Sequence, residues 1–166
     1  MSDAISESSE TLLVRELLQR IGLDLHVVDP GCDIPGSYWG EPEAGLIKNT
    51  LYASLNTPIH SILHETGHYI CMTAERRENL HTDALGNCKG DFMEENAVCY
   101  LQILMSATFP NYSREQIFKD MDAWGYSFRL GSTRAWFEQD AQDAQDWLLG
   151  YGLIDLASEY QFKLRQ

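Results

Sequence analysis

Three residues, His64, Glu65 and His68, form the pattern H-E-x-x-H, whose residue types and spacing are typical of metal-dependent hydrolysis. On a helix, residues four apart lie one turn apart on the same face, so both imidazoles can bind one metal ion. Glu65 follows the first histidine and can accept a proton from water bound to that ion. We therefore predict His64 and His68 as zinc ligands and Glu65 as the catalytic base.

The residues around this pattern predict the helix that it needs, over residues 58–70. Thr57 is a common N-cap residue type and Pro58 a common first helical residue, so the helix should begin here. One stripe of its surface is mainly apolar and comprises Ile59, Leu63, Thr66 and Ile70. The two histidines fall on nearly the opposite side, as expected if one face packs in the core and the other faces a metal ion. The alternative is an ordinary amphipathic helix with both histidines in solvent.

A catalytic zinc ion needs a third protein ligand, and the sequence offers glutamates on a second predicted helix. Asp91 can cap a helix over residues 92–105, with Glu94 in the capping-box position. On a helical wheel Glu94 lies at the margin of the apolar face, whereas Glu95 lies on the far side. We predict Glu94 as the third ligand and Glu95 as the less favoured alternative. Alternatively, both carboxylates could only stabilise the helix by interacting with the positive end of its dipole.

Other side chains are less suited as ligands. His60 lies one turn before the first histidine, but three such residues span about 12 Å of helix, too far for one ion. The third histidine of the pattern H-E-x-x-H-x-x-G-x-x-H is absent. Cys88 could bind a soft metal, although nitrogen or oxygen ligands better suit a water-activating site. Cys71 and Cys99 are predicted to be buried free thiols.

The histidine pair followed by a helix-borne glutamate resembles the gluzincin branch of the zincin metallopeptidases. Residues 94–97 (Glu-Glu-Asn-Ala) and 100–105 (Tyr-Leu-Gln-Ile-Leu-Met) are also similar to the E-x-E-A-N-x-F-A-x-x-L-L-M-P segment of ImmA/IrrE-type metallopeptidases. The resemblance covers residues 50–110. It implies a zinc-dependent peptidase in which the two histidines and Glu94 bind the ion and Glu65 is the general base.

The sequence departs from these families at several positions. Asn96 stands where the second glutamate of the segment is expected, and Tyr100 and Leu101 replace its Phe-Ala pair. Val98 occupies the place of the acidic residue that thermolysin-like enzymes carry one turn after the ligand. The groups that orient the two histidines must therefore come from elsewhere in the chain.

A peptidase also needs a donor that stabilises the negative charge developing on the scissile carbonyl oxygen. Tyr126 and Arg129 lie in a predicted connector and are both candidates, and the sequence does not choose between them. His81 and Asp83, in a polar stretch predicted as a loop over residues 74–90, could orient a ligand histidine or contact substrate.

The chain has 166 residues, enough for one domain with a buried core. We predict a zincin-like α+β fold, mostly helical, with a small sheet before the metal helix. The domain should span residues 10–166, after a disordered tail at residues 1–9. Its first helix is predicted at residues 11–21.

A small sheet is predicted between the first helix and the metal helix. Residues 23–28 alternate in polarity and predict a strand, and residues 44–47 and 50–53 predict a hairpin. Asn49 in its turn tolerates a positive φ. In zincins the strand before the metal helix often offers an open edge, so residues 51–55 are expected to bind an extended peptide by strand addition.

The C-terminal third is predicted to be helical. A helix at residues 114–124 should begin after Ser113 as N-cap. Two further helices are expected, at residues 132–149 and 153–164.

Composition narrows the classes of partner. The net charge of −13 and the lack of a basic patch argue against binding nucleic acid or an anionic membrane. No apolar stretch has the length of a transmembrane helix and the N-terminus does not read as a signal peptide, so a cytoplasmic location is expected. Three functions remain: a zinc peptidase acting on peptides or proteins, a metal-binding regulatory protein with little turnover, and a helical interaction domain without metal.

Overall fold

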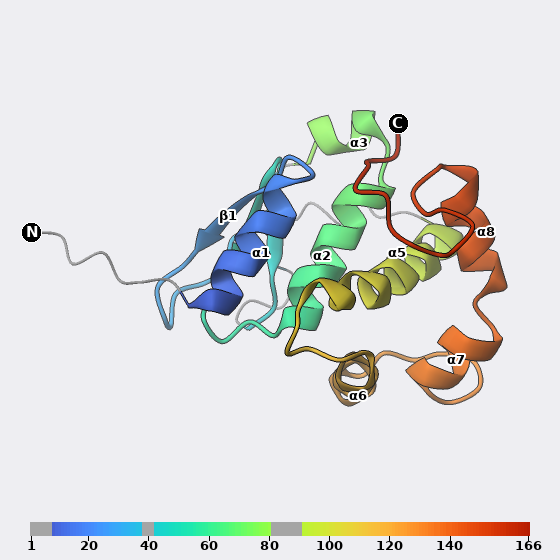
Figure 1. The fold of residues 1–166 in the computed structure, drawn as a ribbon. Helices are drawn as coiled ribbons and strands as arrows, with labels where there is room; N and C mark the ends of the chain where they lie inside the picture. The colour runs from blue at the N-terminus through green and yellow to red at the C-terminus, as the bar shows by residue number, and fades with distance from the viewer. Residues whose placement is uncertain (1–7, 38–41, 81–90) are drawn as a thin grey trace, which may run out of the picture.

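The computed structural model describes residues 8–37, 42–80 and 91–166. Helix α2, Ile59–Cys71, lies at the centre of the fold, between a three-stranded sheet and helix α5, Phe92–Met105 (Figure 1). The fold is α+β and mainly helical, as predicted. Within these residues, no helix is both long enough and apolar enough to cross a lipid bilayer.

The N-terminal helix α1, Ser9–Gln19, packs beside the first strand, β1, Asp24–Val27. It begins before the predicted position because Ser8 caps it, its hydroxyl accepting a hydrogen bond from Thr11 N at 3.2 Å. The last residues of the predicted tail therefore belong to the helix and its cap, whereas residues 1–7 lie outside the described part of the chain.

The predicted hairpin is confirmed as strands β2, Gly45–Ile47, and β3, Thr50–Ala53. The positive φ of its turn is at Lys48 (φ 52°) rather than at Asn49. The strand order is β1-β3-β2, with β3 parallel to β1 and antiparallel to β2. The prediction that residues 51–55 offer an open edge is therefore wrong, because strand β3 is hydrogen bonded on both sides by its neighbours.

Helix α2 is buried on nearly every side. It begins after Pro58, one residue later than predicted, and Thr57 instead accepts a hydrogen bond from Ser54 N at 2.9 Å. Every residue of α2 except His64 is buried, and even His64 is only partly exposed. The sheet covers one side of the helix and α5 the other, so the face that carries the histidines lies against a second helix rather than in open solvent.

Helix α5 begins as predicted. Asp91 Oδ1 accepts a hydrogen bond from Glu94 N at 2.9 Å, which satisfies one of the free N–H groups of the first turn. The helix approaches α2 closely at Gly67: a Cβ atom there would lie only 3.0 Å from Val98 Cγ1 and 3.2 Å from Val98 O. The absence of a side chain at Gly67 thus lets the first turns of α5 reach the histidines.

The C-terminal helices confirm one prediction and change another. Helix α6, Arg114–Trp124, has the predicted bounds and Ser113 as its N-cap. The single helix predicted at residues 132–149 is divided into α7, Thr133–Gln139, and α8, Gln142–Gly150. Helix α8 packs on α5, so this half of the chain covers the side of α5 that does not face α2.

The last predicted helix, at residues 153–164, is wrong. Asp155 Oδ1 accepts hydrogen bonds from backbone N–H groups two and four residues later, which competes with helix formation. Ser158 and Phe162 have positive φ angles of 59° and 54°, outside the helical region. The segment ends against α2, where Arg165 N donates a hydrogen bond to the carbonyl of a residue in its last turn at 2.9 Å.

The remaining described elements are short. Helix α3, Ala74–Glu78, follows α2 within the stretch that was predicted as a loop, and a 3-10 turn η1, Ser106–Thr108, follows α5.

Candidate metal centre

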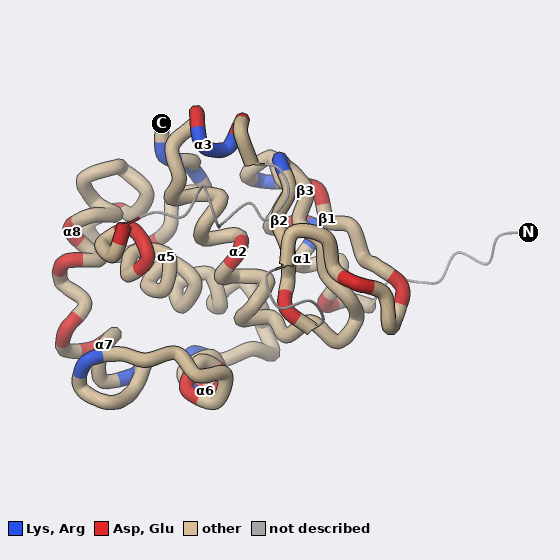
Figure 2. Tube along the Cα trace, turned by 180° about the vertical axis from the view of Figure 1, so that it is seen from behind, with Lys and Arg blue, Asp and Glu red and all other residues tan. Residues whose placement is uncertain are grey.

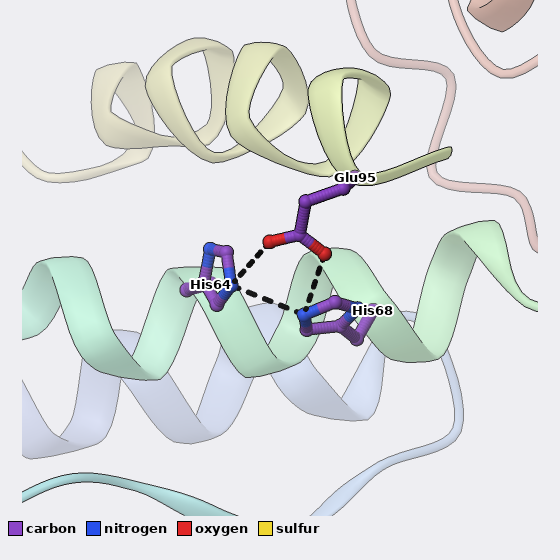
Figure 3. Close-up of side chains that lie close together, drawn as sticks. All are labelled: His64, His68 and Glu95. Carbon is purple, nitrogen blue, oxygen red and sulfur yellow. Dashed lines mark hydrogen bonds and ion pairs between the residues drawn. The ribbon is translucent and has the colours of Figure 1, made fainter. Parts of the chain in front are cut away.

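Two histidines from α2 and one glutamate from α5 converge at the contact between these helices (Figure 3). His64 Nε2 and His68 Nε2 lie 3.1 Å apart. Glu95 Oε1 lies 3.3 Å from His64 Nε2, and Glu95 Oε2 lies 3.5 Å from His68 Nε2. The two Glu95 oxygens thus face different histidines, and a set of one ligand atom from each of the three residues lies within 4.8 Å of one another.

These separations fit a tetrahedral zinc ion. Zinc binds histidine nitrogen at about 2.0–2.1 Å and carboxylate oxygen at about 2.0–2.2 Å, which puts neighbouring tetrahedral ligands about 3.3 Å apart. The 3.1 Å between the two histidine nitrogens is close to that value, and each nitrogen has its own Glu95 oxygen at a similar distance, Oε1 at 3.3 Å from His64 and Oε2 at 3.5 Å from His68. Two histidines and one carboxylate are also a ligand set of catalytic zinc sites, which keep a fourth position for water. The donor set and its spacing could therefore hold zinc.

Glu94, the predicted third ligand, is held by two arginines instead. Arg76 donates two hydrogen bonds to its carboxylate, from Nη1 to Oε2 at 2.7 Å and from Nη2 to Oε1 at 2.8 Å. Arg165 Nη1 donates a third, to Oε2 at 3.1 Å. The ligand prediction is therefore corrected: the glutamate beside the histidines is Glu95, which the helical wheel placed on the solvent side.

Basic residues gather where α3 and the C terminus meet (Figure 2). Arg77 Nη1 donates hydrogen bonds to Tyr69 O and Met72 O at 3.2 and 2.5 Å, and Arg77 Nη2 donates to Arg165 O at 2.5 Å. Guanidinium groups are favoured at the C-terminal end of a helix, where carbonyls lack partners and the dipole is negative. Glu94 thus connects α5 to the arginines that fix the end of the chain on α2.

This arrangement predicts a structural role for Glu94. Replacing it by alanine leaves two largely buried guanidinium groups without their carboxylate, a change that typically lowers the free energy of unfolding by about 3–5 kcal/mol. Glu95 is one-third exposed, so Glu95→Ala should change the free energy of unfolding by less than about 1 kcal/mol in the metal-free protein. Urea unfolding of the two variants measures both values. Equal losses, or a larger loss for Glu95→Ala, would contradict this assignment.

Glu65, the predicted base, is buried with only 4% of its surface exposed. Its Oε2 has no hydrogen-bond partner among the described residues. The pKa of this carboxyl is raised to about 8, mainly by burial; His64 opposes the rise, whereas Glu43 and Glu95 contribute to it. A buried carboxyl with an unpaired oxygen and a shifted pKa is typical of residues that exchange protons at functional sites.

His64 has a partner that the sequence did not reveal, Gln102 on α5. His64 Nδ1 lies 3.0 Å from Gln102 Oε1. Burial lowers the pKa of His64, but Tyr126, Cys99 and Glu95 outweigh this effect and raise it well above its ordinary value in the metal-free protein. The one sequence signal for Gln102 is a polar residue seven positions after Glu95, two helical turns along a mostly apolar helix.

Of the two oxyanion candidates, only Tyr126 lies near the histidines. Its ring centre is 5.5 Å from that of His64, and burial raises the pKa of its hydroxyl, which keeps the proton in place. Arg129 pairs with Asp140 through a side chain that is 79% exposed. The structure therefore favours Tyr126 over Arg129 as the candidate donor, a choice that the sequence left open.

The other predicted site residues have varied outcomes. His60 is 2% exposed, its ring lies edge-on to that of Trp124, and burial lowers its pKa to about 4, so it is a neutral buried residue. Cys71 and Cys99 are buried free thiols, as predicted. The predictions for His81, Asp83 and Cys88 concern positions outside the described residues.

Comparison of the chain with protein-family models, curated proteins and solved structures found no match. The resemblance to zincin metallopeptidases therefore stays a prediction from the motif.

Proposed function

We propose that the protein is a zinc-dependent metallopeptidase with a zincin-like domain, acting on peptides or proteins. The observation that carries the proposal is the convergence of His64, His68 and Glu95 at separations close to those between the ligands of tetrahedral zinc. The buried glutamate next to the first ligand, Glu65, adds the base that peptide hydrolysis needs.

Each residue has a separate task in this reaction. When bound, zinc supplies a Lewis acid that lowers the pKa of water and polarises a carbonyl group. His64, His68 and Glu95 would hold the ion between α2 and α5. Glu65 accepts the proton of the attacking water and returns it to the leaving amine, so that one carboxylate acts first as base and then as acid.

Tyr126 is the candidate donor to the carbonyl oxygen of the substrate. Its hydroxyl oxygen accepts a hydrogen bond from Gln102 Nε2 at 3.3 Å, which leaves the hydroxyl proton able to bind another acceptor. The phenol ring lies edge-on to the ring of His64, with the ring centres 5.5 Å apart, so Tyr126 lies beside one of the proposed metal ligands. Donors of this kind stabilise the transition state more than the ground state.

Metal removal tests the proposal. The purified protein, loaded with zinc and dialysed, should retain one zinc ion per chain by elemental analysis and cleave members of a peptide library detected by mass spectrometry. A chelator should abolish cleavage, and added zinc should restore it. Absence of bound zinc would contradict the metal site. Stoichiometric zinc without any cleavage would instead support the metal-binding regulatory function.

A further inference from the structure

Gln102 is a fully buried amide at the contact between α5 and α2. Burying such a group is costly unless each of its polar atoms has a partner. Its Nε2 donates hydrogen bonds to His60 O at 2.7 Å and to Tyr126 Oη at 3.3 Å, and its Oε1 lies 3.0 Å from His64 Nδ1. Every polar atom of this side chain is therefore engaged.

These partners fix the orientation of the amide. The carbonyl oxygen of His60 can only accept a hydrogen bond, so the atom 2.7 Å from it must be the amide nitrogen. The amide oxygen then faces His64 Nδ1, and an amide oxygen can only accept. A hydrogen bond between these two atoms therefore requires a proton on Nδ1.

A proton on Nδ1 determines the state of the other ring nitrogen. In the neutral ring only one nitrogen carries a proton, so Nε2 keeps its lone pair. This is the atom that faces His68 and Glu95, at 3.1 and 3.3 Å. Without an acceptor at Nδ1, the proton could move to Nε2, where the Glu95 carboxylate would accept it in the place of a metal ion.

We propose that Gln102 is a positioning residue that holds the proton of His64 on Nδ1 and thereby keeps Nε2 as a metal ligand. The proposal rests on the proposed zinc site, but its direct consequence, the position of one proton, belongs to the metal-free protein. Helix α5 then supplies both Glu95 and, two turns later, the group that orients a histidine of α2. Removing such an orienting partner typically weakens metal binding about 10- to 100-fold.

The test compares three variants. Gln102→Met keeps the volume but removes both the acceptor and the amide donor to His60 O, whereas Gln102→Glu restores the acceptor without the amide donor. Ile103→Val truncates the neighbouring fully buried residue without touching the hydrogen bond. Long-range ¹H–¹⁵N spectra of the metal-free proteins, recorded at alkaline pH where the ring is neutral, identify the protonated nitrogen of His64. Titration with a competing zinc chelator gives the dissociation constant for zinc.

Wild type and Ile103→Val should carry the proton on Nδ1, whereas Gln102→Met should shift it to Nε2. Gln102→Met should bind zinc about 10- to 100-fold more weakly, with recovery in Gln102→Glu and no comparable loss in Ile103→Val. A wild-type proton on Nε2, or an equal loss of affinity in Ile103→Val, would overturn the role of Gln102. A proton on Nδ1 in a protein that binds no zinc would support this geometry and overturn the proposed function instead.

Discussion

Replacing Glu95 by alanine should weaken zinc binding about 60- to 700-fold. Structural zinc sites with about four ligands bind the ion with ~10–16 kcal/mol, so one ligand accounts for about 2.5–4 kcal/mol. The carboxylate also supplies a negative charge within 3.5 Å of both histidine nitrogens. Its loss leaves the two imidazoles, which hold zinc poorly at the concentrations used in a chelator competition. That competition measures the change.

The matched control is Glu94→Ala, the neighbouring glutamate on the same turn of α5. Because Glu94 is bound to Arg76 and Arg165 rather than directed at the histidines, its removal should change zinc affinity by less than about threefold under conditions where the protein stays folded. The two variants should thus show opposite patterns, Glu95→Ala losing zinc and Glu94→Ala losing stability. A larger loss of zinc affinity in Glu94→Ala would restore the original ligand prediction.

Replacing Glu65 by glutamine should lower kcat/KM for peptide cleavage by about 100- to 10,000-fold, the usual contribution of a general base. Glutamine has nearly the same shape and fills the buried site, but it cannot take a proton from water. Zinc content should be unchanged, because Glu65 is not among the three residues that meet at the metal site. Initial rates on a cleaved library peptide, with zinc measured on the same sample, give both quantities.

Glu94→Gln is the matched control for this variant, since it neutralises another buried carboxylate of the same helix pair. It should keep most of the cleavage activity when folded. If Glu65→Gln retained activity within about threefold of wild type, general base catalysis by this residue would be refuted.

Local signals predicted much of the fold. The caps at Asp91 and Ser113 and the hairpin around Lys48 were predicted from neighbouring residues, and the structure confirms them. Such features depend on hydrogen bonds within a few residues, which a sequence shows directly. The H-E-x-x-H spacing likewise predicted that the two histidine nitrogens would meet, because one helical turn fixes their distance.

These local signals could not determine whether Glu94 or Glu95 faces the histidines. Apolar residues in the first turn of α5 are not buried: Met93 is 36% exposed, and the preceding Phe92 is 77% exposed. Helix α5 packs against α2, α6 and α8, so apolar residues occur on several sides and do not mark the side that faces the histidines. The partners of Glu94 come from α3 and the C terminus, and no local pattern predicts such long-range ion pairs.

The lack of local signals for long-range contacts also explains why other features were predicted wrongly or missed. The central position of β3 depends on its pairing with β1, across a long connection, and the irregular C-terminal segment depends on Arg165 binding the end of α2. Gln102 was missed because a lone glutamine on a helix carries no motif. Its role becomes visible only when His60 and His64 lie beside it.

A diffraction experiment at the zinc absorption edge, on crystals of the zinc-loaded protein, tests whether His64, His68 and Glu95 bind one zinc ion. We expect a single strong anomalous peak about 2.0–2.2 Å from His64 Nε2, His68 Nε2 and a carboxylate oxygen of Glu95. A zinc-loaded crystal with no peak between these three atoms, or with the peak bound by Glu94 instead, would contradict the proposed site.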